Sequence, residues 1–199
     1  IADILTLAKT NPVVVIDHHK TTMDSLQQYL STVPNLGLSR PYILTNPLPL
    51  DVTLELGTRF IVDLEHSGAY LAWKFFNEGE EVPRLVQYVQ DRDLWKFELP
   101  NSREIHAWLN LFPWTFTAWT EANTILTQNF DIVQDHGKVA LQAEKRCIEE
   151  IVRESRFYHI GGYLVPVVNS PKKFGSGACE FLLNEYTNAK FAAYYFDAG

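Results

Sequence analysis

Cysteine is scarce in this chain of 199 residues, which contains only Cys147 and Cys179. Two isolated cysteines exclude a disulfide-stapled scaffold and a zinc knuckle, because both need closely spaced sets of cysteines. Free thiols are typical of a reducing environment. We therefore expect an intracellular protein in a reducing compartment, with the cytosol and the organelles both left open.

Basic residues are fewer than acidic ones, and long apolar runs are missing from the sequence. Lysine and arginine number 17 against 24 aspartates and glutamates, which gives a formal net charge of −7 and an isoelectric point near 5.3. This balance argues against a broad surface for duplex nucleic acid. A local cationic pocket stays compatible with it, because bound metal ions add positive charge. No apolar run approaches the roughly 20 residues that span a bilayer, so no membrane partner is expected.

The start of the chain lacks two further features. There is no initiator methionine, and residues 1–19 have neither the basic start nor the small-residue cleavage site of a secretory signal. The chain opens directly on an amphipathic stretch, so we expect a fragment of a longer protein. What is present is a hydrophobic content of 46%, which is ordinary for a globular protein with a packed core.

The apolar pattern alternates strands with helices, which predicts an α/β fold. Residues 13–16 (VVVI) are a β-branched run without polar alternation, which indicates a parallel strand buried on both faces. The run ends in Asp17-His18-His19, and open α/β sheets present their chemistry at strand C-termini. Helices are predicted over residues 2–9, 23–32, 69–77, 82–91 and 101–111. The helix over 69–77 is nearly all apolar and is therefore expected to be buried. A short strand is predicted over 60–63, and an inserted loop or hairpin over 34–57.

The second half of the chain begins with one long predicted helix over residues 131–156. Gly161-Gly162 then indicates a turn, and Gly175-Ser176-Gly177 a second turn. A strand over 163–168, a helix to about residue 186 and a strand over 191–196 complete the pattern. Residues 157–199 are therefore predicted to begin a second α/β unit with one β-α-β pass.

The triplet Asp17-His18-His19 is the strongest candidate for chemistry. Imidazole binds manganese, iron and zinc, and an adjacent aspartate can orient the ring or bind the ion itself. Adjacent side chains in an extended segment point in opposite directions, so we expect different tasks for the two histidines. The alternative is an exposed strand end without function.

The segment VVVIDHHKT resembles the namesake motif of the DHH phosphoesterases, which include RecJ-type exonucleases, nanoRNases, cyclic-dinucleotide phosphodiesterases and manganese-type pyrophosphatases. Three further segments are similar to a branch described as DHH phosphohydrolases or oligoribonuclease-like proteins. They are SGAYLAWKFF (67–76), VPRLVQYVQDRDLWKFELPNSREIHAWL (82–109) and VPVVNSP (165–171). The resemblance covers essentially the whole chain.

The resemblance implies a role for each site residue. His18 matches the metal-ligating histidine, with Asp17 supporting it, and His19 matches the catalytic histidine that contacts the substrate phosphate. Asp91 matches a later metal-bridging aspartate, and Asp93 is the alternative, because both fall in one turn and spacing does not choose between them. Without the family, Asp91-Arg92-Asp93 is typical of a solvated helix end with a local ion pair.

The activity implied by the resemblance is hydrolysis of phosphodiester or phosphomonoester bonds in small nucleotides or short oligonucleotides. Two divalent ions, preferably Mn²⁺, would activate water for the reaction. The implied architecture is a parallel-sheet DHH phosphoesterase domain over 1–130, a linker helix over 131–156, and the start of a substrate-binding domain over 157–199.

The chain also departs from the family pattern. The upstream Asp-x-Asp motif, a further upstream aspartate and the downstream Gly-Gly-His segment are missing from these 199 residues. We therefore expect the chain alone to be inactive and the parent protein to carry the activity. The alternative function is a non-catalytic DHH-like subunit of an oligomer or larger assembly. A third interpretation is a nucleotide-binding module with one metal ion or none.

Two other groups have structural interpretations. Asp63, Glu65 and His66 resemble a metal cluster in composition, but solvated charges before a helix are the expectation. Trp108, Trp114 and Trp119 are predicted to pack in the core or at an interface rather than to stack on bases, because no basic residues alternate with them.

Overall fold

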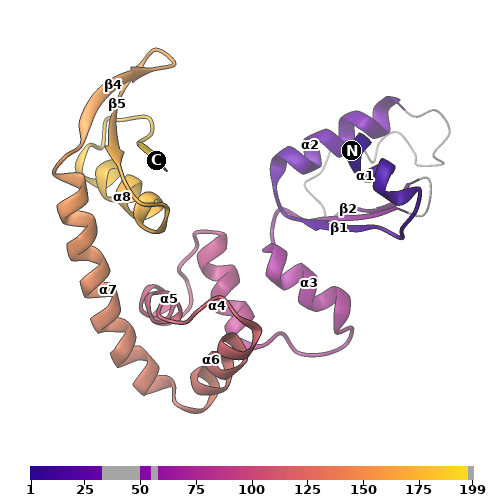
Figure 1. The fold of residues 1–199 in the computed structure, drawn as a ribbon, viewed down its shortest axis with the longest axis horizontal. Helices are drawn as coiled ribbons and strands as arrows, with labels where there is room; N and C mark the ends of the chain where they lie inside the picture. The colour runs from indigo at the N-terminus through magenta and orange to yellow at the C-terminus, as the bar shows by residue number, and fades with distance from the viewer. Residues whose placement is uncertain (33–49, 55–57, 197–199) are drawn as a thin grey trace. The chain divides into compact units, whose positions relative to one another are not determined.

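The computed structural model describes residues 1–32, 50–54 and 58–196, and it shows a mixed α/β protein (Figure 1). The chain divides into two compact units, each of which is described here by itself. Unit 1 comprises Ile1–Ser102 and Trp114–Asn129, and unit 2 comprises Arg103–Pro113 and Phe130–Gly199. In the described part of the chain, each unit contains one three-stranded sheet.

The sheet of unit 1 is mixed. Its strands are β1 (Val14–Asp17), β2 (Leu50–Thr53) and β3 (Arg59–Val62), in the order β1-β3-β2. β3 runs parallel to β1 and antiparallel to β2. Parallel strands end at the same edge, and Asp63, just after β3, donates its backbone N–H to the carbonyl of Asp17 at 3.1 Å. The C-terminal ends of β1 and β3 therefore lie side by side at one edge of the sheet.

Helices cover this sheet. α1 (Ala2–Ala8) and α2 (Lys20–Thr32) lie on one side, and α3 (Gly68–Phe76), which contacts β1, lies on the other (Figure 1). Leu26 of α2 and Phe60 of β3 are fully buried, and each such side chain contributes about 1.5–3 kcal/mol. The core joins α2 to the sheet through Met23, Leu26, Leu30, Val52, Leu54, Phe60 and Val62.

Two expectations for this region were wrong. β1 is not buried on both faces, since it lies at the edge of the described sheet and Val14 is 44% exposed. α3 is not wholly buried either, because Phe76 is 75% exposed. An apolar run marks residues suited to packing, but the neighbouring elements decide which of them are covered. Of the insertion expected over 34–57, residues 34–49 and 55–57 lie outside the described residues, and β2 pairs with β3.

Unit 1 continues with α4 (Arg84–Asp93) and α6 (Phe116–Gln128), which pack together. The backbone N–H of Leu85 donates to Asn123 Oδ1 at 3.3 Å. α6 was not predicted. Its start carries a recognisable signal, because the Thr115 hydroxyl accepts a hydrogen bond from the Ala118 N–H and so caps the helix.

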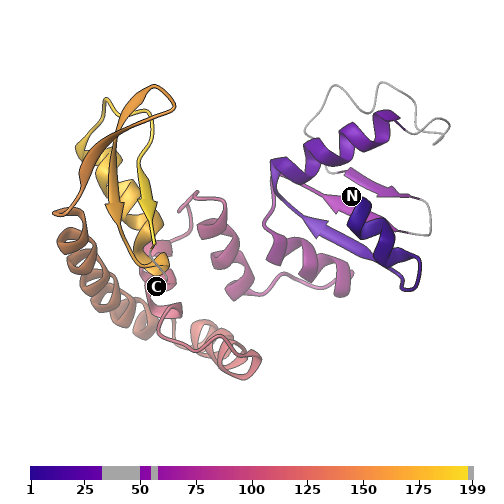
Figure 2. The same ribbon diagram turned by 45° about the horizontal axis from the view of Figure 1, so that its top comes forward.

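The sheet of unit 2 consists of β4 (Arg156–Ile160), β5 (Tyr163–Asn169) and β6 (Ala193–Tyr195), in that order. β4 and β5 form a hairpin through Gly161-Gly162, whose φ angles of 59° and 84° suit a two-residue turn. β6 runs parallel to β5 after α8 (Lys172–Glu185), which packs against the sheet (Figure 2). The β-α-β pass predicted from the sequence is present, whereas β4 was missed.

Unit 2 also contains α5 (Ser102–Leu109), apart from its first residue, and α7 (Phe130–Val152). Near its C-terminus α7 packs Ile148 and Val152 against Val168, Ala178 and Leu182. Gly137 allows α7 to approach α5, because a Cβ atom there would overlap the carbonyl of Glu104. The long helix predicted over 131–156 as a linker is thus a packed part of unit 2.

The second predicted turn, Gly175-Ser176-Gly177, was wrong because these residues lie inside α8. A Cβ atom on Gly175 would overlap the ring of Tyr194, and one on Gly177 would lie 2.7 Å from Ile148 Cδ1. The glycines therefore make room for packing on both sides of the helix. Glycine serves turns and close contacts equally, so its presence alone did not distinguish them.

Helices that combine the length and apolarity needed to cross a membrane do not occur in the part of the chain that the structure describes.

Candidate functional site

Asp17 organises the turn between β1 and α2. Its Oδ1 atom accepts hydrogen bonds from the backbone N–H groups of His18 at 2.7 Å and His19 at 3.3 Å, which is the pattern of an Asx turn. The Thr22 hydroxyl donates to Oδ2 from the first turn of α2. The carboxylate therefore joins the strand end to the helix start.

The pKa of the Asp17 carboxyl is about 2. Partial burial acts to raise this pKa, but hydrogen bonds from Thr22, from the His19 ring and from the backbone of His18 and His19 outweigh it. Asp17 is consequently ionised at neutral pH and supplies a fixed negative charge to the turn.

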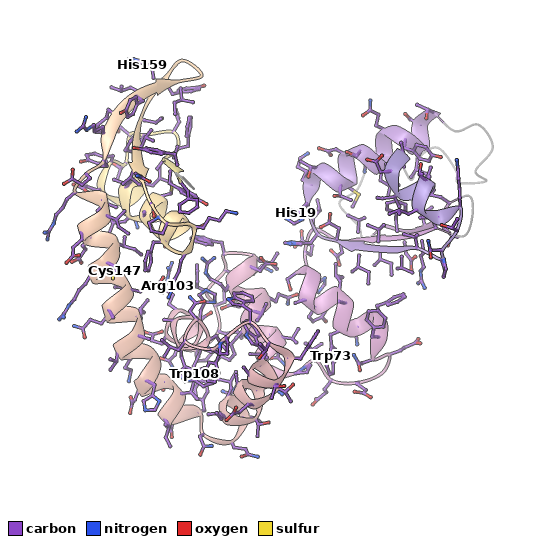
Figure 3. All side chains as sticks on the ribbon, in the orientation of Figure 1. His19, Trp73, Arg103, Trp108, Cys147 and His159 are labelled. Atoms are coloured by element: carbon purple, nitrogen blue, oxygen red, sulfur yellow. The ribbon has the colours of Figure 1, made fainter. Side chains whose placement is uncertain are left out.

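His19 is held by this charge while it remains open to solvent. Its Nδ1 atom lies 2.6 Å from Asp17 Oδ1, and its side chain is 66% exposed (Figure 3). The hydrogen bond to Asp17 and the charge of Asp17 raise the pKa of His19 above its usual value. The imidazolium form, which can donate a hydrogen bond through Nε2 to an anion, is thereby favoured.

His18 contacts a different carboxylate. Its Nε2 atom lies 3.3 Å from Asp93 Oδ2, and the side chains are 17% and 46% exposed, respectively. The first residue of α3, Gly68, lies beside the ring, since a Cβ atom there would be 3.7 Å from His18 Cδ2. Three elements, the β1–α2 turn, α3 and α4, thus meet at His18.

The two histidine rings do not point in opposite directions, as an extended segment would require. Their centroids are 4.4 Å apart with an interplanar angle of 49°. The expectation was wrong because β1 ends at Asp17 and the chain turns before α2 begins at Lys20. The rings nevertheless bind different partners, Asp93 for His18 and Asp17 for His19.

Asp91 and Asp93 differ in what their carboxylates contact. Asp91 is buried, and its two oxygens accept the N–H groups of Glu98 at 2.9 Å and Leu99 at 3.2 Å. Its carbonyl also accepts the N–H of Lys96 at 2.9 Å. Asp91 therefore holds the loop after α4, and Asp93 is the aspartate that reaches His18.

A second Asp–His pair, Asp63 and His66, lies at the same edge of the sheet. The sequence pattern did not predict the contact between these two residues. Asp63 is buried, and its Oδ2 lies 2.7 Å from His66 Nδ1, while its Oδ1 accepts the Glu65 N–H at 2.8 Å. His66 in turn stacks on Tyr70 with centroids 4.5 Å apart. The expectation of solvated charges was wrong for Asp63. An aspartate directly after a second strand was the signal that could have identified it.

The donor chemistry at His18 and Asp93 suits a divalent cation. An imidazole nitrogen and a carboxylate oxygen 3.3 Å apart are near enough to share one ion, and both are ligand types that Mn²⁺ accepts. Groups of three or more histidine, cysteine, aspartate or glutamate residues arranged to hold a metal ion do not occur among residues 1–32, 50–54 and 58–196.

Comparison with known proteins gives a distant similarity to an uncharacterized protein of Acanthamoeba polyphaga mimivirus. The two are 26% identical over 149 residues, which make up 74% of this chain and 28% of the viral protein. The chain thus spans less than a third of the length of that relative. No protein-family model matches the chain, and no solved structure matches it.

Proposed function

We propose that the Asp17-His18-His19 turn and Asp93 form the site of a metal-dependent phosphoesterase acting on small nucleotides or short oligonucleotides. The observation that carries the proposal is the 3.3 Å approach of His18 Nε2 to Asp93 Oδ2. The two residues belong to VVVIDHHKT and to DRDLW, two segments on which the resemblance to DHH phosphoesterases rests. An imidazole and a carboxylate that meet from separate motifs support a shared ligand role. In this proposal, β1 and β3 are the parallel strands of a DHH-type domain.

His19 is the residue that contacts the substrate phosphate in this proposal. Asp17 holds its Nδ1 and raises its pKa, so the ring favours the charged form. The exposed ring then donates a charge-assisted hydrogen bond from Nε2 to a phosphate oxygen. Asp17 is a positioning residue, because it acts on the substrate through His19.

His18 and Asp93 would hold the divalent cation. A bound Mn²⁺ would neutralise phosphate charge and lower the pKa of the attacking water. His18 is well placed for this task, because its side chain is only 17% exposed and the carboxylate of Asp93 limits its ring orientation.

The test is Mn²⁺-dependent hydrolysis of short RNA and of dinucleotides by the natural full-length product that contains these residues. His18→Ala and Asp93→Asn should each lower Mn²⁺ affinity by at least about 10–100-fold, because loss of an outer-shell partner of a ligand already has an effect of that size. His19→Ala should lower turnover while Mn²⁺ affinity stays within about 3-fold, because the ring contacts the substrate and not the ion.

His136→Ala is the matched control, since His136 is an exposed histidine on α7 in unit 2. It should leave both Mn²⁺ binding and turnover unchanged. Absence of turnover on every phosphate ester offered, or equal turnover before and after His18→Ala, would contradict the proposal.

A non-catalytic subunit is the second candidate, and one observation favours it. Both carboxylate oxygens of Asp17 are already engaged by hydrogen bonds within the turn, as in a structural Asx motif. For such a subunit, His18→Ala and His136→Ala would have the same small effect on Mn²⁺ retention. Electron paramagnetic resonance of Mn²⁺ added to the purified chain separates the two candidates.

A further inference from the structure

The loop that follows α4 is held in one conformation by Asp91. Its buried carboxylate accepts two backbone N–H groups, from Glu98 and Leu99, and its carbonyl accepts those of Lys96 and Phe97 at 2.9 and 3.3 Å. Four backbone donors thus converge on one residue. A loop fixed in this way presents its side chains in defined positions.

Two aromatic residues in this loop have unusual backbone angles. Trp95 has φ of 57° and Phe97 has φ of 53°, in the left-handed region that bulky residues rarely adopt. Each such residue costs on the order of 1–3 kcal/mol, and strained positions of this kind concentrate at functional sites and ligand clamps. A glycine or asparagine would meet the backbone requirement at lower cost, so the aromatic rings need another explanation.

Trp95 is stacked from one side and open to solvent. The guanidinium carbon of Arg92 lies 3.9 Å from the centroid of the Trp95 ring, and Phe97 meets the same indole edge-on with centroids 5.3 Å apart. The Trp95 residue remains 41% exposed. A cation against an aromatic face stabilises the ring in place, and the Phe97 contact restricts its rotation. The result is an indole that is fixed and accessible.

Trp95 is close in the sequence to a residue of the proposed site. Trp95 follows two residues after Asp93, whose carboxylate contacts His18. In the proposed site, an aromatic ring two residues along the chain from Asp93 suits a ligand that combines a phosphate with a flat ring. Nucleotides have this combination, and every nucleobase has a π-face that stacks on an indole.

We propose that Trp95, backed by Arg92 and fixed by Phe97, is a stacking platform for a nucleobase of the bound substrate. This inference rests on the proposed phosphoesterase site and names the residue that would recognise the base of its nucleotide substrates. Sugar phosphates and other base-free phosphate esters would gain nothing from the platform. Trp95 would select the substrate by binding its base, a step that is separate from cleavage of the phosphate ester.

The test measures binding of AMP and of ribose phosphate to the natural full-length product that contains these residues by calorimetry, with and without Mn²⁺. The chain should bind AMP about 10-fold more tightly or better, because stacking contributes about 1–3 kcal/mol per base. Trp95→Ala should remove this preference and leave ribose phosphate affinity within about 2-fold, since only the base contact is lost. Trp95→Phe should retain most of the preference. Trp114→Ala is the matched control, because Trp114 is an exposed tryptophan of the same unit.

The indole N–H resonances provide a second measurement that is independent of activity. The Trp95 signal, assigned by its loss in Trp95→Phe, should shift on addition of AMP and stay in place with ribose phosphate. An unchanged AMP preference in Trp95→Ala, an equal loss of affinity for both ligands, or a wild-type chain without preference would each overturn the platform. A chain that prefers AMP through Trp95 yet cleaves no ester would support the platform and contradict the phosphoesterase alone.

Discussion

His18 and Asp93 lie with Nε2 and Oδ2 only 3.3 Å apart, and this contact joins the turn after β1 to the last turn of α4. Asp91 is on the same helix, two residues earlier. Two residues correspond to roughly 200° around an α-helix, so the two carboxylates leave α4 on nearly opposite sides. One reaches His18, and the other holds the loop that carries Trp95.

The two aspartates should therefore respond differently to substitution. Asp93→Asn is expected to lower Mn²⁺ affinity by about 10-fold or more, because amide oxygen is a weaker ligand than carboxylate. The free energy of unfolding should change by less than about 1 kcal/mol, because the Asp93 side chain is 46% exposed. Mn²⁺ titration and urea unfolding of the same preparation check both parts. A large loss of stability with unchanged Mn²⁺ affinity would show that the His18–Asp93 contact is structural.

Asp91→Ala should mainly destabilise the protein. The change leaves the N–H groups of Glu98 and Leu99 without their acceptor, and hydrogen bonds to a charged group contribute about 1.5–3 kcal/mol each. The two bonds together predict a loss of about 3–6 kcal/mol in the free energy of unfolding, measured by urea denaturation. Glu98→Ala removes a side chain at the same loop but keeps the backbone donor, and it serves as the control with little change. Equal stability of Asp91→Ala and Glu98→Ala would contradict the role given to Asp91.

The Asp17–His19 pair predicts a specific pH dependence. The pKa of His19 is raised, so its contribution to stability is present below the unfolded value of about 6.5 and is lost as pH rises through the higher folded value. The pKa of Asp17 is lowered to about 2, so its contribution is present above the unfolded value and is lost as pH falls toward 2. Asp17→Asn should therefore destabilise the chain most between about pH 4 and 6.5.

Nuclear magnetic resonance titration of the histidine ring protons measures this coupling directly. His19 should titrate above the ordinary histidine value in the wild type and near that value in Asp17→Asn. An unchanged His19 pKa in Asp17→Asn would rule out the negative charge of Asp17 as the cause of the raised pKa.

Gly175→Ala tests the packing of α8 against β6. Alanine is the better helix former by about 1 kcal/mol, yet its Cβ would overlap the Tyr194 ring. Overpacking typically costs about 1–3 kcal/mol, so we expect net destabilisation in thermal unfolding. Tyr194→Ala should relieve the overlap, and Gly175→Ala should then be neutral or stabilising in that background. Ser176→Ala, at an exposed position of the same helix, is the control.

Some features of the site follow directly from local sequence. The β-branched run before Asp17 and the helix after it place the two histidines at a strand end, and the structure has them there. The choice between Asp91 and Asp93 is different, because both fit the same spacing. In the structure, the backbone N–H groups of Glu98 and Leu99 donate to the Asp91 carboxylate, so this carboxylate is already engaged by the loop. The path of this loop decides the case, and helical periodicity does not reveal that path.

The wrong predictions about the fold have a similar cause, because contacts between separate elements cannot be seen in the local sequence pattern. Gly175 and Gly177 indicated a turn, but their partners Tyr194 and Ile148 lie on other elements. The outward exposure of Val14 depends on which strands flank β1, not on its own β-branched neighbours. The position of Asp63 directly after a strand could be recognised in the sequence. Its contact with His66 depends on the turn that follows the strand.

The assignment of α5 to unit 2 has a consequence for synthesis on the ribosome. Residues 103–113 are made before 114–129, which belong to unit 1, and before α7 and α8, where Gly137 and Glu180 contact Glu104 and Arg103. At about 5–20 residues per second, α5 waits several seconds for these partners. During that interval its apolar side chains lack some of the partners that bury them in the finished protein; these side chains are Ile105, Trp108 and Leu109.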